Sequence, residues 1–178
     1  MKLSIFLRLA GALTVMAPAL ALSGPPAIAQ QNVGQKLVIE RDWGAYVAQQ
    51  QGAKVCFALS TPKDMQPGGL NRGEALFYVI IRPTEGVREE VAITPGYTFR
   101  DGSQATITIG ENTFTLFTQQ NKAFVENAAT EAQLVAAMKA GSVMVVRGTS
   151  SRGNETTDQY SLFGVTAAIT AATRACEQ

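Results

Sequence analysis

The two cysteines constrain the fold of this chain more than any other feature of its sequence. Cys56 lies within residues 43–62, where apolar and polar positions alternate on either side of a Gln-Gln-Gln-Gly connection, a pattern that predicts a β-hairpin. Cys176 is the third residue from the end. A bond between the two sulfurs would tie the first hairpin to the last element, and so long a closed loop stabilises a fold by about 4–5 kcal/mol at most. Two free buried thiols and an intermolecular bond are the alternatives.

The first 29 residues have the features of a secretory signal peptide. Two basic residues precede or border an apolar run over residues 9–22, and Ala27-Ile28-Ala29 fits the small-x-small rule, so we expect cleavage after Ala29. An uncleaved membrane anchor is the alternative, which Pro18 within the run disfavours. Export would place the chain in the periplasm, at the cell surface or outside the cell. In such an oxidising compartment an even pair of cysteines is expected to form a disulfide.

Composition bounds the number of domains and excludes several classes of function. The chain has 178 residues, and residues 30–178 are long enough for one domain of ordinary size. Its formal net charge of +1, without a basic run, argues against nucleic acid as a partner. Histidine is absent, which removes histidine bases, Ser-His catalytic triads and nearly all zinc sites. We therefore expect no cofactor, no metal and no catalytic residue.

Alternating apolar positions predict a mainly β fold of about eight short strands. The continuous apolar run over residues 76–81 predicts a central strand buried on both faces, and residues 61–73 are predicted to be a loop. Residues 97–100, followed by Asp101-Gly102, have the signature of a tight hairpin turn. The predicted strands otherwise cover residues 36–40, 43–47, 55–59, 76–81, 87–93, 106–109, 113–117, 143–149 and 156–163.

Two helices are predicted in the second half of the chain. Residues 130–140 are rich in alanine, open with Thr130 and Gln133 as a capping box and end at Gly141. The expected buried side chains of this helix are Leu134, Val135 and Met138. Residues 165–176 keep apolar positions on one face, which would carry Cys176 to the strand of Cys56. Short strands, frequent turns and two peripheral helices together predict an antiparallel β-sandwich or barrel.

One polar segment, residues 150–158 between two predicted strands, is the best candidate for a binding site. It brings hydroxyls, a guanidinium and carboxylates to one hairpin end, and an arginine flanked by hydroxyl donors can hold an anionic group. A hairpin loop whose polar side chains only satisfy backbone groups is the alternative. The candidate residues are Ser150, Ser151, Arg152, Asn154, Thr156 and Asp158.

Two further features have plainer interpretations. Glu89 and Glu90 look like paired carboxylates, but neighbours on a strand point to opposite faces, so we expect them on a solvated edge of the sheet. Trp43 could serve as a platform for a ligand, but we expect it to anchor the core near the disulfide instead.

Several segments, in order over nearly all of residues 30–178, resemble the invasion-associated locus B family of Gram-negative bacteria. The resemblance implies an exported protein with a small immunoglobulin-like β-sandwich and a disulfide between Cys56 and Cys176. It also implies a link to the invasion of host cells in some relatives, whereas others occur in free-living bacteria. No catalytic residues are agreed for the family, so none is carried over. The segments that carry the resemblance are Trp43-Gly44-Ala45-Tyr46, Lys54-Val55-Cys56-Phe57-Ala58, 110–117 (GENTFTLF), 134–141 (LVAAMKAG), 146–162 (VRGTSSRGNETTDQYSL) and 164–176.

From these features we expect a non-enzymatic protein-interaction module, exported to the periplasm or the cell surface. Its partner would be a protein of the envelope or of a host, bound through strand edges or through residues 150–158. Two alternatives stay open. One is an enzyme that acts on envelope polymers through two converging carboxylates. The other is an accessory subunit of a membrane complex, with peripheral association with the membrane.

Overall fold

The computed structural model describes residues 34–178, which belong to one compact unit. The expectation of a mainly β fold with two helices is confirmed, since this part of the chain holds eleven antiparallel strands, two α-helices and a short 3-10 helix. The predicted signal peptide and its cleavage after Ala29 lie outside the described residues. The strands are β1 (Gln35–Glu40), β2 (Trp43–Gln50), β3 (Ala53–Ser60), β4 (Asp64–Gln66), β5 (Leu76–Arg82), β6 (Val87–Thr94), β7 (Gln104–Ile109), β8 (Asn112–Gln119), β9 (Lys122–Phe124), β10 (Val143–Thr149) and β11 (Glu155–Ser161). The helices are η1 (Pro83–Glu85), α1 (Ala128–Ala140) and α2 (Val165–Glu177).

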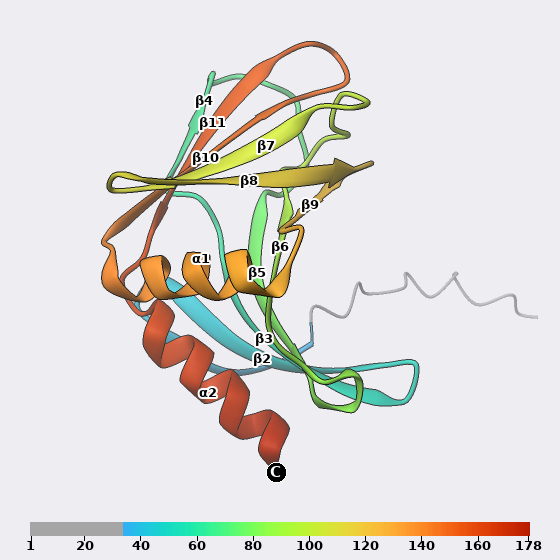
Figure 1. Ribbon diagram of the computed structural model, residues 1–178, viewed down its shortest axis with the longest axis vertical. Coiled ribbons are helices and arrows are strands. Elements are labelled where there is room, and N and C mark those ends of the chain that lie inside the picture. The colour runs from blue at the N-terminus through green and yellow to red at the C-terminus, as the bar shows by residue number, and fades with distance from the viewer. Residues whose placement is uncertain (1–33) are drawn as a thin grey trace, which may run out of the picture. The chain divides into compact units, whose positions relative to one another are not determined.

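Hydrogen bonds join the strands in the order β1-β2-β3-β5-β6-β9-β8-β7-β10-β11-β4. The series falls into two halves, because β6 and β9 share only two residue pairs. In Figure 1 the strands β4, β7, β8, β10 and β11 lie in the upper part of the view, and β2 and β3 lie in the lower part. The inner faces of the halves meet in one hydrophobic cluster, where the ring centroids of Phe77 on β5 and Tyr160 on β11 are 5.6 Å apart. Two facing layers around one core are what the expected sandwich requires.

The predicted first hairpin is confirmed as β2 and β3, joined by a two-residue turn. Gln51 and Gly52 both have positive φ angles, 51° and 83°, as the type I′ turns that suit the twist of a hairpin require. Trp43, at the start of β2, is 1% exposed, and its Nε1 donates to the carbonyl oxygen of Ser161 at 2.9 Å. The prediction that Trp43 anchors the core is therefore confirmed, but Trp43 belongs to the main hydrophobic cluster and not to the separate cluster that holds the disulfide.

Three local predictions differ from the structure. The segment 61–73 is not only a loop, because β4 forms within it and pairs with β11. Residues 97–100 form no strand, and Phe99 makes only an isolated bridge to Ser150. Strand β5 is fully buried on one face only, and its other face is half-buried. In the first two cases the deciding partner lies far away in the chain, where a local pattern carries no information about it.

Helix α1 begins earlier than predicted. Its N-cap is Asn127 rather than Thr130, and the Asn127 side chain accepts a hydrogen bond from the Thr130 backbone N at 2.9 Å. The capping box of Thr130 and Gln133 is therefore wrong, whereas the end of the helix at Gly141 is confirmed. The buried side chains of α1 are the predicted Leu134, Val135 and Met138.

Helix α1 covers an open edge of β6. The pairing of β6 with β9 starts only at Ala92, and the backbone N of Val91 donates instead to Glu131 Oε1 at 2.7 Å. Burial raises the pKa of the Glu131 carboxyl above its ordinary value, although the hydrogen bond from Val91 lowers it. The Glu131 carboxylate of α1 thus accepts the backbone hydrogen bond that a neighbouring strand would otherwise accept.

Replacing Glu131 by glutamine is expected to favour the folded state more at pH 7 than at pH 4. Because folding raises the pKa of Glu131, the stability it contributes is fully present below its unfolded pKa and is lost as the pH rises through the folded pKa. Glutamine keeps an acceptor for the Val91 N–H without the charge, whereas E131A leaves that donor unpaired and should cost about 1–3 kcal/mol at both pH values. Urea unfolding at the two pH values measures this. If the free energy of unfolding of E131Q minus that of the wild type is smaller at pH 7 than at pH 4, the account is contradicted.

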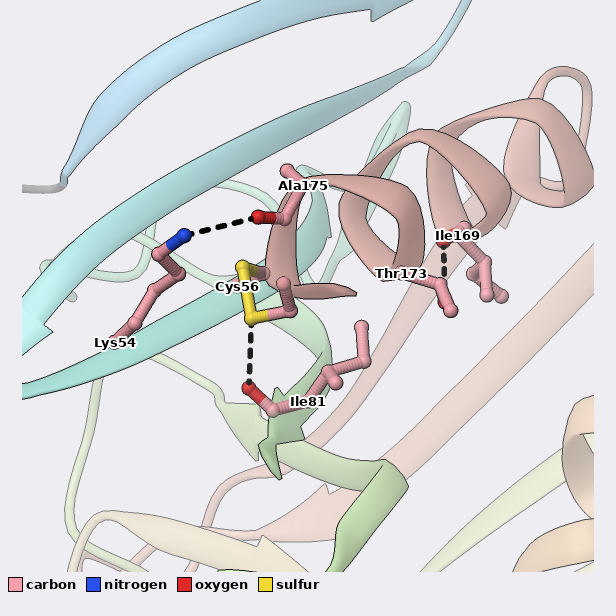
Figure 2. The surroundings of a disulfide bond; sticks show 7 residues. Lys54, Cys56, Ile81, Ile169, Thr173 and Ala175 are labelled. Atoms are coloured by element: carbon pink, nitrogen blue, oxygen red, sulfur yellow. Dashed lines mark hydrogen bonds between the residues drawn. A yellow bond between two sulfur atoms is a disulfide. The ribbon is translucent and has the colours of Figure 1, made fainter. Parts of the chain in front are cut away.

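Helix α2 packs along β2 and β3 and ends at the disulfide (Figure 2). Cys56 on β3 is fully buried and bonded to Cys176, with their Cα atoms 5.8 Å apart, so the expected pairing is confirmed. Nearby, Lys54 Nζ donates to the carbonyl oxygen of Ala175 at 3.3 Å, in the last turn of α2, where helix carbonyls lack partners. The buried face of α2 consists of Val165, Ala168, Ile169 and Ala172, as its predicted apolar face requires.

Alanine at Gly164, the residue before α2, is expected to lower the free energy of unfolding by about 2–3 kcal/mol. Gly164 has a φ of 96°, and a Cβ atom there would overlap the carbonyl oxygen of Glu40. Gly153 is the matched control, because its φ is 86° but nothing lies within 4 Å of an added Cβ, so G153A should cost only about 1 kcal/mol. Thermal and urea unfolding compare the two. Equal losses of unfolding free energy in G164A and G153A would show that the close approach of Gly164 to Glu40 of β1 does not affect stability.

Candidate functional site

Three loops that follow β4, β6 and β10 line a cleft of ≈ 520 Å³. It is lined by residues 70–73 after β4, residues 96–98 after β6, and residues 150–152 with Asn154 after β10. The middle loop is tied to both others, because Gly73 N donates to Gly96 O at 2.7 Å and Ser151 N donates to Thr98 O at 2.8 Å. The volume of the cleft falls within the range of about 300–1,000 Å³ that is usual for ligand sites.

A buried ion pair between Arg72 and Asp158 lies beneath this cleft. The two side chains are 6% and 4% exposed. Arg72 Nη1 donates to Asp158 Oδ2 at 3.0 Å, and Nη2 donates to Oδ1 in a second, shorter contact. Nη1 also donates to the carbonyl oxygen of Pro95 at 3.4 Å. The two-pronged contact fixes the plane of the guanidinium, and it therefore fixes the loop of Arg72 to strand β11.

Burial and pairing act in opposite directions on this ion pair. Burial disfavours the charged guanidinium, but the hydrogen bond and the charge of Asp158 outweigh it and raise the pKa of Arg72. Burial also raises the pKa of the Asp158 carboxyl, against the opposing effect of the Arg72 guanidinium. Arg72 thus stays a cation whose charge is already balanced from inside the protein.

Tyr97 is held in the cleft by a second buried residue of β11. Its hydroxyl oxygen lies 2.6 Å from Thr156 Oγ1, and either oxygen can donate in this hydrogen bond. Thr156 Oγ1 also lies 3.3 Å from the carbonyl oxygen of Gly148. The Arg72 Cζ atom lies 5.9 Å from the centroid of the Tyr97 ring, within range of a cation–π contact. Burial raises the pKa of the Tyr97 hydroxyl, while its hydrogen bond with Thr156 lowers it.

The structure divides the predicted binding residues into two groups. Those that line the cleft are Ser150, Ser151, Arg152 and Asn154. Thr156 and Asp158 are only 3% and 2% exposed and are not part of the lining, and Ser150 lines the cleft although it is only 5% exposed. The alternation of β11 turns the side chains of Thr156 and Asp158 toward the core. They position Tyr97 and Arg72 and do not face solvent.

Arg72 and Tyr97 also line the cleft, although neither was among the residues predicted from sequence. Asp158 carried a signal for Arg72, because an aspartate at an inward strand position needs a cationic partner. That partner lies 86 residues away in the chain. The sequence therefore indicated that Asp158 needs a cationic partner, but it did not indicate which arginine or lysine this is. For Tyr97 we find no comparable signal.

Glu89 and Glu90 turn to different partners, as expected for neighbours on a strand. Lys139 Nζ donates to Glu89 Oε1 at 2.6 Å, and Arg82 Nη2 donates to Glu90 Oε2 at 2.5 Å. Both carboxylates are ion-paired, and their side chains are 33% and 26% exposed. The two do not converge on one point.

Neither a metal cluster nor a membrane span is found within residues 34–178. No three His, Cys, Asp or Glu side chains of this part come together as metal ligands would. None of its helices has the length and the apolar character needed to cross a membrane.

The family model described as invasion associated locus B (IalB) protein matches residues 43–173, well over half of the chain. The chain belongs to the IalB family. This confirms the resemblance that the sequence segments indicated. The crystal structure of invasion associated protein B from Bartonella henselae is similar to this IalB-family chain, with a TM-score of 0.58 and 15% sequence identity over 81% of this chain and 98% of that one. At that identity the likeness shows a shared fold. No curated protein matches the chain significantly.

Proposed function

We propose that this IalB-family chain is an exported, non-enzymatic binding module that holds a protein partner in the cleft between its three loops. One observation carries the proposal. The buried polar or charged residues of the described part are Ser60, Ser150, Thr156 and Asp158. Three of these four lie at or beneath the cleft, where they fix the loops that line it. Loops that are fixed before binding lose less conformational entropy when a partner arrives.

The partner and the location follow from the export features of the sequence. The predicted signal peptide and the disulfide both suit the periplasm or the outer surface. A partner there is a protein of the envelope or of a host surface. The name of the similar Bartonella henselae protein connects that protein with invasion. A role in invasion for this chain rests on that likeness and is part of the proposal.

The two alternatives from the sequence stay predictions. A carboxylate-dependent enzyme needs two acidic groups on one substrate atom, and Glu89 and Glu90 face different partners. The residues that line the cleft include no aspartate or glutamate. No specific contact of the described residues favours an accessory subunit of a membrane complex.

Blocking the cleft tests the proposal. Ser151 is exposed at the rim, and S151W would fill the cleft without replacing a buried residue. Thr166 is exposed on α2, away from the cleft, so T166W is the matched control. In affinity capture from the cell envelope or from host surface extracts, wild type and T166W should retain the same partner and S151W should lose it. Retention by S151W would contradict the proposal.

A further inference from the structure

The cleft carries one positive charge that the protein does not balance. Its lining includes two arginines and no acidic residue. Arg72 is neutralised by Asp158 from beneath. Arg152 is exposed at the rim and takes part in none of the ion pairs of residues 34–178. A guanidinium is charged at any physiological pH, so Arg152 presents a full charge to whatever enters the cleft.

We propose that the cleft takes a single carboxylate from an acidic segment of its protein partner, with Arg152 as the cation that pairs with it. The inference rests on the proposed function and adds the chemistry of the ligand. One unbalanced charge is matched by one carboxylate, whereas a phosphate dianion would leave charge unpaired in a partly closed site. A carboxylate also accepts two parallel hydrogen bonds from one guanidinium, which sets its orientation.

The rest of the lining suits a polypeptide rather than a free anion. Leu70 and the ring of Tyr97 offer apolar surface beside the charge, and Ser151 and Asn154 offer hydrogen-bonding groups at the rim. A small inorganic ion would use none of this apolar surface. A glutamate or aspartate with an apolar neighbour would use both parts of the cleft, so the occupant is an acidic segment with apolar side chains.

Peptide titration of the isotope-labelled, disulfide-bonded chain tests the inference by NMR. The probes are the N-acetylated, C-amidated pentapeptide Gly-Leu-Glu-Leu-Gly, its glutamine counterpart, and inorganic phosphate. The glutamate peptide should shift the backbone amide signals of Thr98, Ser151 and Arg152, and the glutamine peptide should not. R152Q should weaken binding of the glutamate peptide about tenfold. R174Q removes the same charge from an exposed position on α2 and should leave binding unchanged.

Four results would overturn the inference. These are no binding of the glutamate peptide, equal binding of the glutamine peptide, phosphate binding as tight as that of the glutamate peptide, and the same effect of R152Q and R174Q. The capture experiment separates this failure from that of the proposed function. If the glutamate peptide does not bind but S151W still loses the partner, the carboxylate inference fails and the binding module stands. If S151W keeps the partner, the binding module itself fails.

Discussion

The double substitution C56A and C176A is expected to lower the free energy of unfolding by about 4 kcal/mol. The bond joins residues 120 positions apart, so its loss frees almost the whole described chain in the unfolded state. Cys56 is fully buried on β3, and Cys176 is at the end of α2, so the bond also fixes the last helix to the first hairpin. Urea unfolding of the purified chain, with and without a reducing agent, measures the effect.

Two comparisons make this experiment decisive. Reduced wild type should unfold at nearly the same urea concentration as the double variant, because both lack the same bond. Hydrogen exchange should show the largest loss of protection in the last turns of α2, where Lys54 Nζ remains the only hydrogen-bond donor from β3 to the helix end among the described side chains. A loss below about 1 kcal/mol would show that the noncovalent packing of α2 suffices.

D158A is expected to cost about 3–5 kcal/mol, because it leaves the Arg72 cation buried without its counter-charge. Replacing both partners, as in R72M with D158L, should recover most of that loss, since two apolar side chains can fill the space without a desolvated charge. The free energies of unfolding of the wild type, R72M, D158L and the double variant form a double-mutant cycle that isolates the interaction of the pair.

An exposed ion pair supplies the control for this cycle. Glu89 and Lys139 have side chains that are 33% and 35% exposed, so E89A should cost about 0.5 kcal/mol. If D158A costs no more than E89A, Arg72 finds water or another acceptor, and the claim that the ion pair holds the cleft loop fails. A double variant less stable than D158A would also contradict the account.

The regular parts of the fold could be predicted from sequence because their signals are local. The alternation in β2 and β3 and the buried stripe of α1 each occupy one short stretch. The disulfide could be predicted because the chain has two cysteines and therefore one possible intramolecular pairing, and because the sequence predicts export. Strand β4 could not be predicted from sequence, because it is only three residues long and forms only by pairing with β11.

Only part of the candidate site could be predicted from sequence, because only some of its residues carry a local signal. Ser151 and Arg152 lie in a loop whose polar composition marks it as exposed, and they line the cleft. Arg72 and Tyr97 enter the cleft from other loops, through pairings with Asp158 and Thr156 that span 86 and 59 residues. Such pairings depend on the strand order, which no single segment of the sequence encodes.

Photo-cross-linking in intact cells is the most direct test of the claim that this cleft is the binding surface. A benzophenone side chain placed at Ser151, on the cleft rim, should yield one recurrent protein adduct. The same group at Thr166, exposed on α2, should yield none of that adduct. Adding R152Q to the Ser151 probe should reduce the adduct strongly. The same adduct from both positions, or none from the cleft rim, would contradict the account.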